Sequence, residues 1–120
     1  MMFAVEIVLK DREDAVTETL VHEGNDASAW TDHDVEGVLK EILQAIDRAA
    51  NPGVEERAVT LRGFSWIVEP SDDQVIIAVE IPSGAAVAGP FDIEQPKLDA
   101  LITRVIAGAR AAQTGSTRVH

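Results

Sequence analysis

Apolar and polar residues alternate over residues 3 to 9, and this pattern predicts a half-buried β-strand, because successive side chains of a strand point to opposite faces. One face carries Phe3, Val5, Ile7 and Leu9, and the other carries Ala4, Glu6 and Val8. The charged residues 10 to 14 predict a loop, and residues 15 to 22, rich in Val and Thr, predict a second strand. The first 22 residues are therefore expected to form a hairpin.

The spacing of apolar residues then changes to that of a helix, which is expected between Thr31 and the stop signal Asn51-Pro52-Gly53. Its apolar stripe consists of Val35, Val38, Leu39, Ile42, Leu43 and Ile46. Thr31 and Asp34 have the spacing of a capping box, and Trp30 before the cap is placed to pack on Val35. The start of this helix is therefore specified by local residues.

The second half of the chain predicts a similar order of elements. Residues 57 to 69 predict a third strand with a bulge at Gly63, residues 70 to 73 a tight turn, and residues 75 to 81 a fourth strand. The Gly- and Ala-rich residues 83 to 90 predict a loop that leads to Asp92, the expected cap of a second helix. The apolar stripe of that helix is Leu98, Leu101, Ile102, Val105 and Ile106. Residues 113 to 120 are predicted to be a flexible tail.

An offset of 59 to 60 residues aligns the two halves, which indicates an internal duplication of a strand-strand-helix unit over about 1–52 and 56–112. Ile7-Val8 then matches Ile67-Val68, and the two helical stripes coincide. The predicted fold is a single α+β domain over residues 1–112, a two-layer sandwich. A four-stranded antiparallel sheet in the order 2-1-3-4 carries two helices on one face, with a right-handed crossover through the first helix.

Two helices on one side of the sheet leave the other side open. The alternation assigns apolar residues to the middle of that open side, and the predicted interface residues are Val8, Ile67, Ile76 and Ala78. Contiguous apolar patches of a few hundred Å² are typical of interaction sites, whereas scattered surface Ile and Val are common and need no partner. The sequence thus predicts association through the open sheet face.

Composition limits the partners. The 120 residues contain 10 Lys and Arg against 21 Asp and Glu, a formal net charge of -11, which repels nucleic acid and anionic membranes and favours a basic protein partner. The absence of cysteine excludes disulfides, thiolate nucleophiles and zinc-thiolate sites. No run of residues is long and apolar enough to cross a bilayer, and the apolar residues 2 to 9 lack the basic start of a signal peptide. A cytoplasmic location is expected.

Motifs for metal or nucleotide binding are incomplete. Asp32 to Gly37 resemble the first half of an EF-hand calcium loop, but Leu43 stands where the bidentate Glu is required. The loop over residues 84 to 89 lacks the Lys and the Ser or Thr of a phosphate-binding loop. His22, His33 and His120 lack the spacing of a metal site and are expected to be solvated on the surface. No cofactor or metal is expected.

The prediction for function is a noncatalytic protein-interaction module that self-associates as a homodimer through its open sheet face, with a basic protein as the other expected partner. The alternative is a small-molecule binding protein or enzyme that uses a cleft between the helix N-termini and the loops 23–33 and 83–92. Trp30, His33 and Asp34 are the candidate ligand-binding residues for that alternative, and no residue stands out as catalytic.

Overall fold

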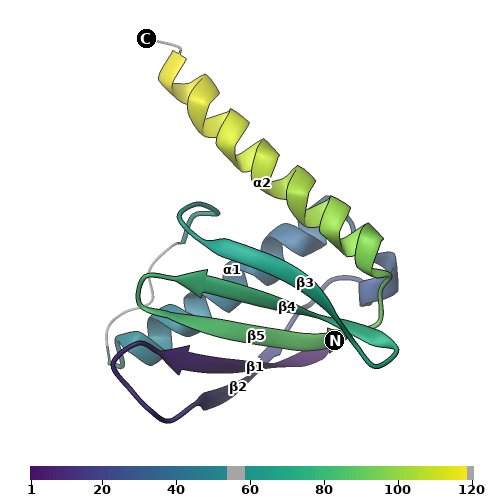
Figure 1. Ribbon diagram of the computed structural model, residues 1–120. Helices are drawn as coiled ribbons and strands as arrows, with labels where there is room; N and C mark the ends of the chain where they lie inside the picture. Colours follow the sequence, from purple (N-terminus) through teal and green to yellow (C-terminus); the bar gives the residue numbers. More distant parts are fainter. Residues whose placement is uncertain (54–58, 119–120) are drawn as a thin grey trace.

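The computed structural model describes residues 1–53 and 59–118, with side chains described up to residue 109. Its elements are β1 (Met2–Leu9), β2 (Val16–Val21), the 3-10 turn η1 (Ala27–Ala29), α1 (Asp32–Ala50), β3 (Ser65–Ser71), β4 (Gln74–Ile81), β5 (Gly84–Phe91) and α2 (Gln95–Arg118). Figure 1 shows α1 behind the sheet and α2 rising past the edge formed by β3. The predicted α+β class, with one antiparallel sheet and two helices, is confirmed.

The sheet has five strands in the order β2-β1-β5-β4-β3, so the predicted four-stranded order 2-1-3-4 is wrong. Residues 84 to 91 form a strand instead of a loop, and this strand pairs with β1 on one side and β4 on the other. β3 is thereby moved from the expected centre to the edge. Since β5 has no counterpart in the first half, the internal duplication gains no support from the pairing.

Small residues explain both why β5 escapes sequence-based prediction and why it fits at the centre. Gly, Ala and Pro have low strand propensity, and they make up most of its sequence GAAVAGPF. Ala86 and Ala88 nevertheless point inward and are buried, and α1 contacts the strand on this side. Gly89 has φ of 129°, which favours glycine, and it lies beside the register shift between Val75 and Ile77 of β4.

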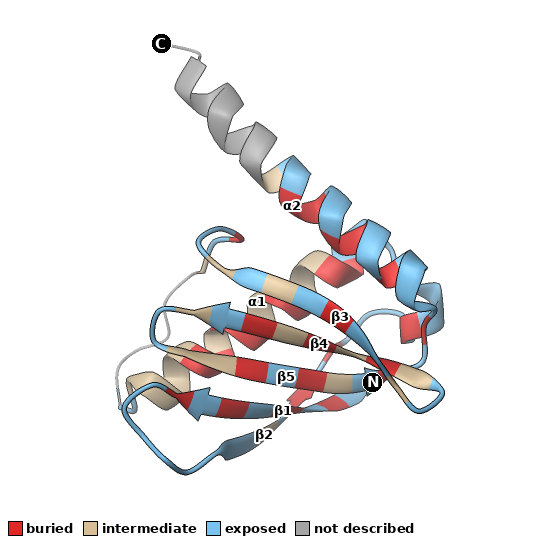
Figure 2. Ribbon diagram, in the orientation of Figure 1, coloured by how far each residue is buried: buried red, intermediate tan, exposed pale blue. Residues whose placement is uncertain are grey.

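The core lies between the sheet and the helices. Every second residue of β1 is buried, and α1 contacts β1, β2 and β5, while α2 contacts α1 and β3. Figure 2 shows the resulting alternation of buried and exposed residues along β1 and β5. Phe91 joins the parts of this core, because its ring lies 5.2 Å from that of Phe3 and 4.9 Å from that of Trp30.

The predicted helix start and helical stripes are found. Thr31 caps α1 in a capping box with Asp34, and all six stripe residues of α1 are buried. The five predicted stripe residues of α2 are buried as well. The α2 backbone is helical as far as Arg118, so the flexibility of residues 113 to 120 stays a prediction, and residues 119 and 120 lie outside the described residues.

Neither helix, over the residues that the structure describes, is long and apolar enough to cross a bilayer.

Replacing Ala88 by Leu tests the central position of β5. The larger side chain would have to enter a filled core, so we expect the free energy of unfolding to fall by about 1 to 3 kcal/mol. Val87→Leu is the matched control, because Val87 is the next residue and its side chain is exposed, so a change within about 0.5 kcal/mol is expected. Urea unfolding measures both variants. Equal effects of the two would show that residues 84 to 91 do not alternate across a sheet.

Candidate functional site

The side of the sheet away from the helices, called here the open face, is defined by the strand register. One row across four strands consists of Glu6, Val87, Ala78 and Ile67, which are paired in turn from β1 through β5 and β4 to β3. The next row contains Val8, Ala85, Glu80 and Ser65. Paired side chains of neighbouring strands lie on the same face, so these rows form one continuous surface.

The open face holds most of the exposed large apolar side chains. Within the described residues there are six such side chains, and five of them are on this face: Met2, Val8, Val21, Ile67 and Val87. The sixth, Val16, pairs with the buried Ile7 and therefore belongs to the helix side of the sheet. This concentration distinguishes the face from a surface with scattered apolar residues.

All four predicted interface residues lie on the open face. Val8 and Ile67 are 45% and 51% exposed, while Ile76 and Ala78 are partly buried. Ala78 is paired with both Ile67 and Val87, so the register brings β3, β4 and β5 residues together. Sequence reasoning missed Val87 because its strand was predicted to be a loop. That this face is an interface stays a prediction.

Acidic side chains are the only charged groups that the strands place on this face. The five strands contain no Lys or Arg, and their four glutamates are Glu6, Glu18, Glu69 and Glu80. Glu18 points to the helix side, where it forms an ion pair with Arg48. The other three are exposed on the open face and form no ion pair with the residues that the structure describes.

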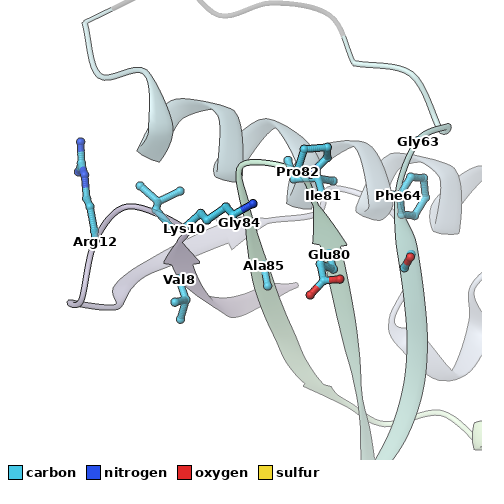
Figure 3. Close-up of a pocket in the computed structure, with 12 residues that line it drawn as sticks. Val8, Lys10, Arg12, Gly63, Phe64, Glu80, Ile81, Pro82, Gly84 and Ala85 are labelled. Carbon is cyan, nitrogen blue, oxygen red and sulfur yellow. The ribbon is translucent and has the colours of Figure 1, made fainter.

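A cavity of about 880 Å³ lies at the end of the open face where β1 finishes and β4 turns into β5. Figure 3 shows the Lys10 side chain extending toward Gly84. The side chains of Val8, Ala85 and Glu80 all point to one side of the sheet, toward the bottom of the view. The lining includes four open-face residues, Val8, Ser65, Glu80 and Ala85, together with Lys10 and Arg12 from the loop after β1. The cavity is therefore the hollowed end of the open face. Lys10 and Arg12 are the only cationic residues among its described lining residues.

A second polar feature, buried beneath the start of α1, is centred on Asp34. His22 Nε2 lies 3.0 Å from Asp34 Oδ1, and these residues are only 7% and 4% exposed. The backbone N–H and hydroxyl of Thr31 and the side-chain amide of Asn25 each donate to Asp34 Oδ2 at 3.0 Å. The prediction that His22 is solvated is therefore wrong, because the ring is used to satisfy a buried carboxylate.

These hydrogen bonds shift the titration of Asp34. The Thr31 backbone N–H and then the His22, Asn25 and Thr31 side chains hold the pKa of Asp34 far below its ordinary value, although burial opposes this shift. Glycine is required nearby for space, since a Cβ at Gly24 would lie 2.0 Å from Asp34 Oδ1 and 2.4 Å from His22 Nε2. The arrangement fastens the segment after β2 onto the start of α1.

The structure places the three candidate residues of the alternative ligand-binding site in different surroundings, and that site stays a prediction. Residues 84 to 91 are a strand, so they cannot form one wall of the expected cleft as a loop. Trp30 is buried, packs on Phe91 and donates its Nε1–H to the carbonyl of Asn25 at 2.9 Å, whereas His33 is exposed. Asp34 is occupied by its cap and its buried hydrogen bonds. Trp30 and Asp34 therefore have structural roles.

Glu41 lies close to the same cluster and lines a shallow hollow of about 450 Å³ with His22, His33 and Gly37. Burial raises the pKa of Glu41, while the nearby His22 opposes that rise. Across the described part of the chain, no group of three or more His, Asp or Glu side chains is placed to hold a metal ion. The hollow is thus lined by several titratable side chains, but among the described residues these are not placed as a set of metal ligands.

No family model, curated protein or solved structure matches the chain, so its function has to be inferred from the geometry of its own residues.

The buried carboxylate generates a pH prediction. A pKa lowered by folding means that the ionised Asp34 stabilises the native state at pH above about 4, and that this stabilisation is lost as the pH falls below that value. Asp34→Asn should lower the free energy of unfolding at pH 7 by about 1 to 3 kcal/mol. Its unfolding midpoint in urea should then fall less than that of the original chain between pH 5 and about pH 3. Parallel curves for the two proteins would contradict the assignment.

Proposed function

We propose that this chain is a noncatalytic protein-interaction module that binds its partner through the open face. The observation that supports the proposal is the gathering of five exposed large apolar side chains on the one side of the sheet that no described helix covers. Removing such side chains from water contributes about 25 cal/mol per Å² of apolar surface. A complex in which a partner covers the face would therefore be stabilised mainly by the apolar residues at the centre of the face. The polar residues at its rim would provide specificity.

The dimensions of the face suit a protein partner. Five strands at about 4.8 Å spacing and about eight residues per strand give a surface of about 24 by 26 Å, or roughly 600 Å². Specific interfaces cover about 600 to 1,000 Å² on each partner, so the face alone reaches the lower end of this range.

The chemistry of the face favours binding over catalysis. Its polar groups are the three glutamates and the hydroxyls of Thr17, Thr19 and Ser65. None of these hydroxyls is hydrogen-bonded to a base among the residues that the structure describes, so no activated nucleophile is formed there. The deepest polar pair, His22 and Asp34, serves the packing of α1.

The predicted homodimer and a different protein are the two occupants to be compared. Both require the apolar row of Ile67, Ala78 and Val87, and both would be prevented by a charge placed in that row. The charges around the row distinguish between the two occupants.

Ile67→Lys tests the proposal for either occupant, because the charge would have to be buried in the interface. In sedimentation of the fluorescently labelled chain in extract of its source cells, the original chain should sediment as a complex larger than 12.9 kDa. Ile67→Lys should sediment as the monomer, with at least about tenfold weaker association. Val16→Lys is the matched control, since Val16 is exposed on the helix side of the sheet and its variant should retain the complex.

Circular dichroism of both variants checks that the fold is retained. The proposal is wrong if the original chain sediments as a monomer at every concentration of the extract. It is also wrong if Ile67→Lys and Val16→Lys have the same effect on sedimentation of the complex.

A further inference from the structure

On the open face, β5 and β4 lie between β1 and β3, and their side chains on this side are mostly apolar. These are Ala85, Val87 and Gly89 on β5, and Ile76 and Ala78 on β4. The surface over these two strands is called here the central strip. The cavity lies at the Lys10 end of this strip.

Carboxylates lie on both of the strands that flank the central strip. Glu6 lies on β1 in the same row as Val87, and Glu69 lies on β3 two residues from Ile67. Since β1 and β3 are three strand spacings apart, the two glutamates are separated by about 14 Å across the sheet. Glu80 lies within the central strip beside the cavity. The strip is therefore mostly apolar, with one carboxylate on it and one on each flanking strand.

We propose that the partner is a basic amphipathic α-helix that lies on the central strip along β4 and β5, an inference that rests on the function proposed above. A helix with its side chains is about 10 to 12 Å wide, so it fits between Glu6 and Glu69, whose strands are about 14 Å apart. Its apolar stripe would cover Ala78, Val87 and Ile76, and Lys or Arg on either side of the stripe would meet Glu6 and Glu69. Lys10 and Arg12 line the cavity at one end of the face. They favour the orientation in which the negative C-terminal end of the partner helix lies at that cavity.

A second copy of the chain fits this face less well. Two open faces stacked on each other would bring six carboxylates into one interface, because each carries Glu6, Glu69 and Glu80 and the strands supply no cation. Burying unpaired charges is costly, and like charges across an interface suppress association. Lys10 and Arg12 lie beyond one end of the strands and cannot meet all of these carboxylates at once. Charge complementarity therefore selects a cationic partner.

The test uses three synthetic 18-residue helical peptides, which share a length and differ in chemistry. One has a leucine stripe edged by lysines, the second has glutamates in place of the lysines, and the third has serines in place of the leucines. Fluorescence anisotropy of the labelled peptides with the full chain, at 50 and 200 mM salt, should show binding of the leucine-lysine peptide only. Added salt should weaken that binding, since exposed ion pairs are screened.

Glutamine substitutions locate the binding site without adding bulk. The triple variant Glu6→Gln, Glu69→Gln, Glu80→Gln should weaken binding of the leucine-lysine peptide by about tenfold. The control variant Glu13→Gln, Glu23→Gln, Glu94→Gln removes the same charge from exposed residues off the face and should weaken it by less than about threefold.

The outcomes separate the two proposals. Equal weakening of peptide binding by the two triple variants, or tight binding of the leucine-glutamate peptide, would overturn the inference of a basic helix. If Ile67→Lys still abolished binding in that case, the open face would remain the proposed binding surface. A homodimer that excludes the peptide would likewise assign the face to a second copy. Binding of the peptide that is unchanged in Ile67→Lys would overturn both proposals.

Discussion

β5 is paired with a neighbouring strand on each of its two sides. Its hydrogen bonds to β1 on one side and β4 on the other join the first hairpin to the second into one continuous sheet. Small side chains contribute on the inner side, where Ala86 and Ala88 are buried and allow α1 to approach the strand. The packing of the first helix on the sheet therefore depends on this Gly- and Ala-rich segment.

Polar interactions at one end of the sheet fix how the first helix enters this arrangement. Asp34 gathers donors from Thr31, Asn25 and His22, and this network sets the path of the chain between β2 and α1. The indole of Trp30, held by its bond to the Asn25 carbonyl, then packs on Phe91 at the end of β5. These hydrogen bonds thus support the packing at the end of β5.

Local signals predicted part of this fold, and non-local pairing determined the rest. The cap at Thr31 and Asp34, the stripes of both helices and the alternation of β1 depend on neighbouring residues, so the sequence predicts them. β5 depends on its two neighbours and on burial, which override the poor strand propensity of GAAVAGPF. The candidate site follows this division, since Val8, Ile67, Ile76 and Ala78 were predicted from alternation whereas Val87 and the buried role of His22 were not.

Methyl NMR of the labelled chain titrated with the leucine-lysine peptide distinguishes the open face from the helical layer as the binding surface. We expect the Ile67, Ala78 and Val87 methyl signals to shift together, while the methyl signals of Val16 on the helix side stay in place. Shifts confined to Val16 and to the residues of α1 and α2, with the three open-face methyl groups unchanged, would contradict this expectation.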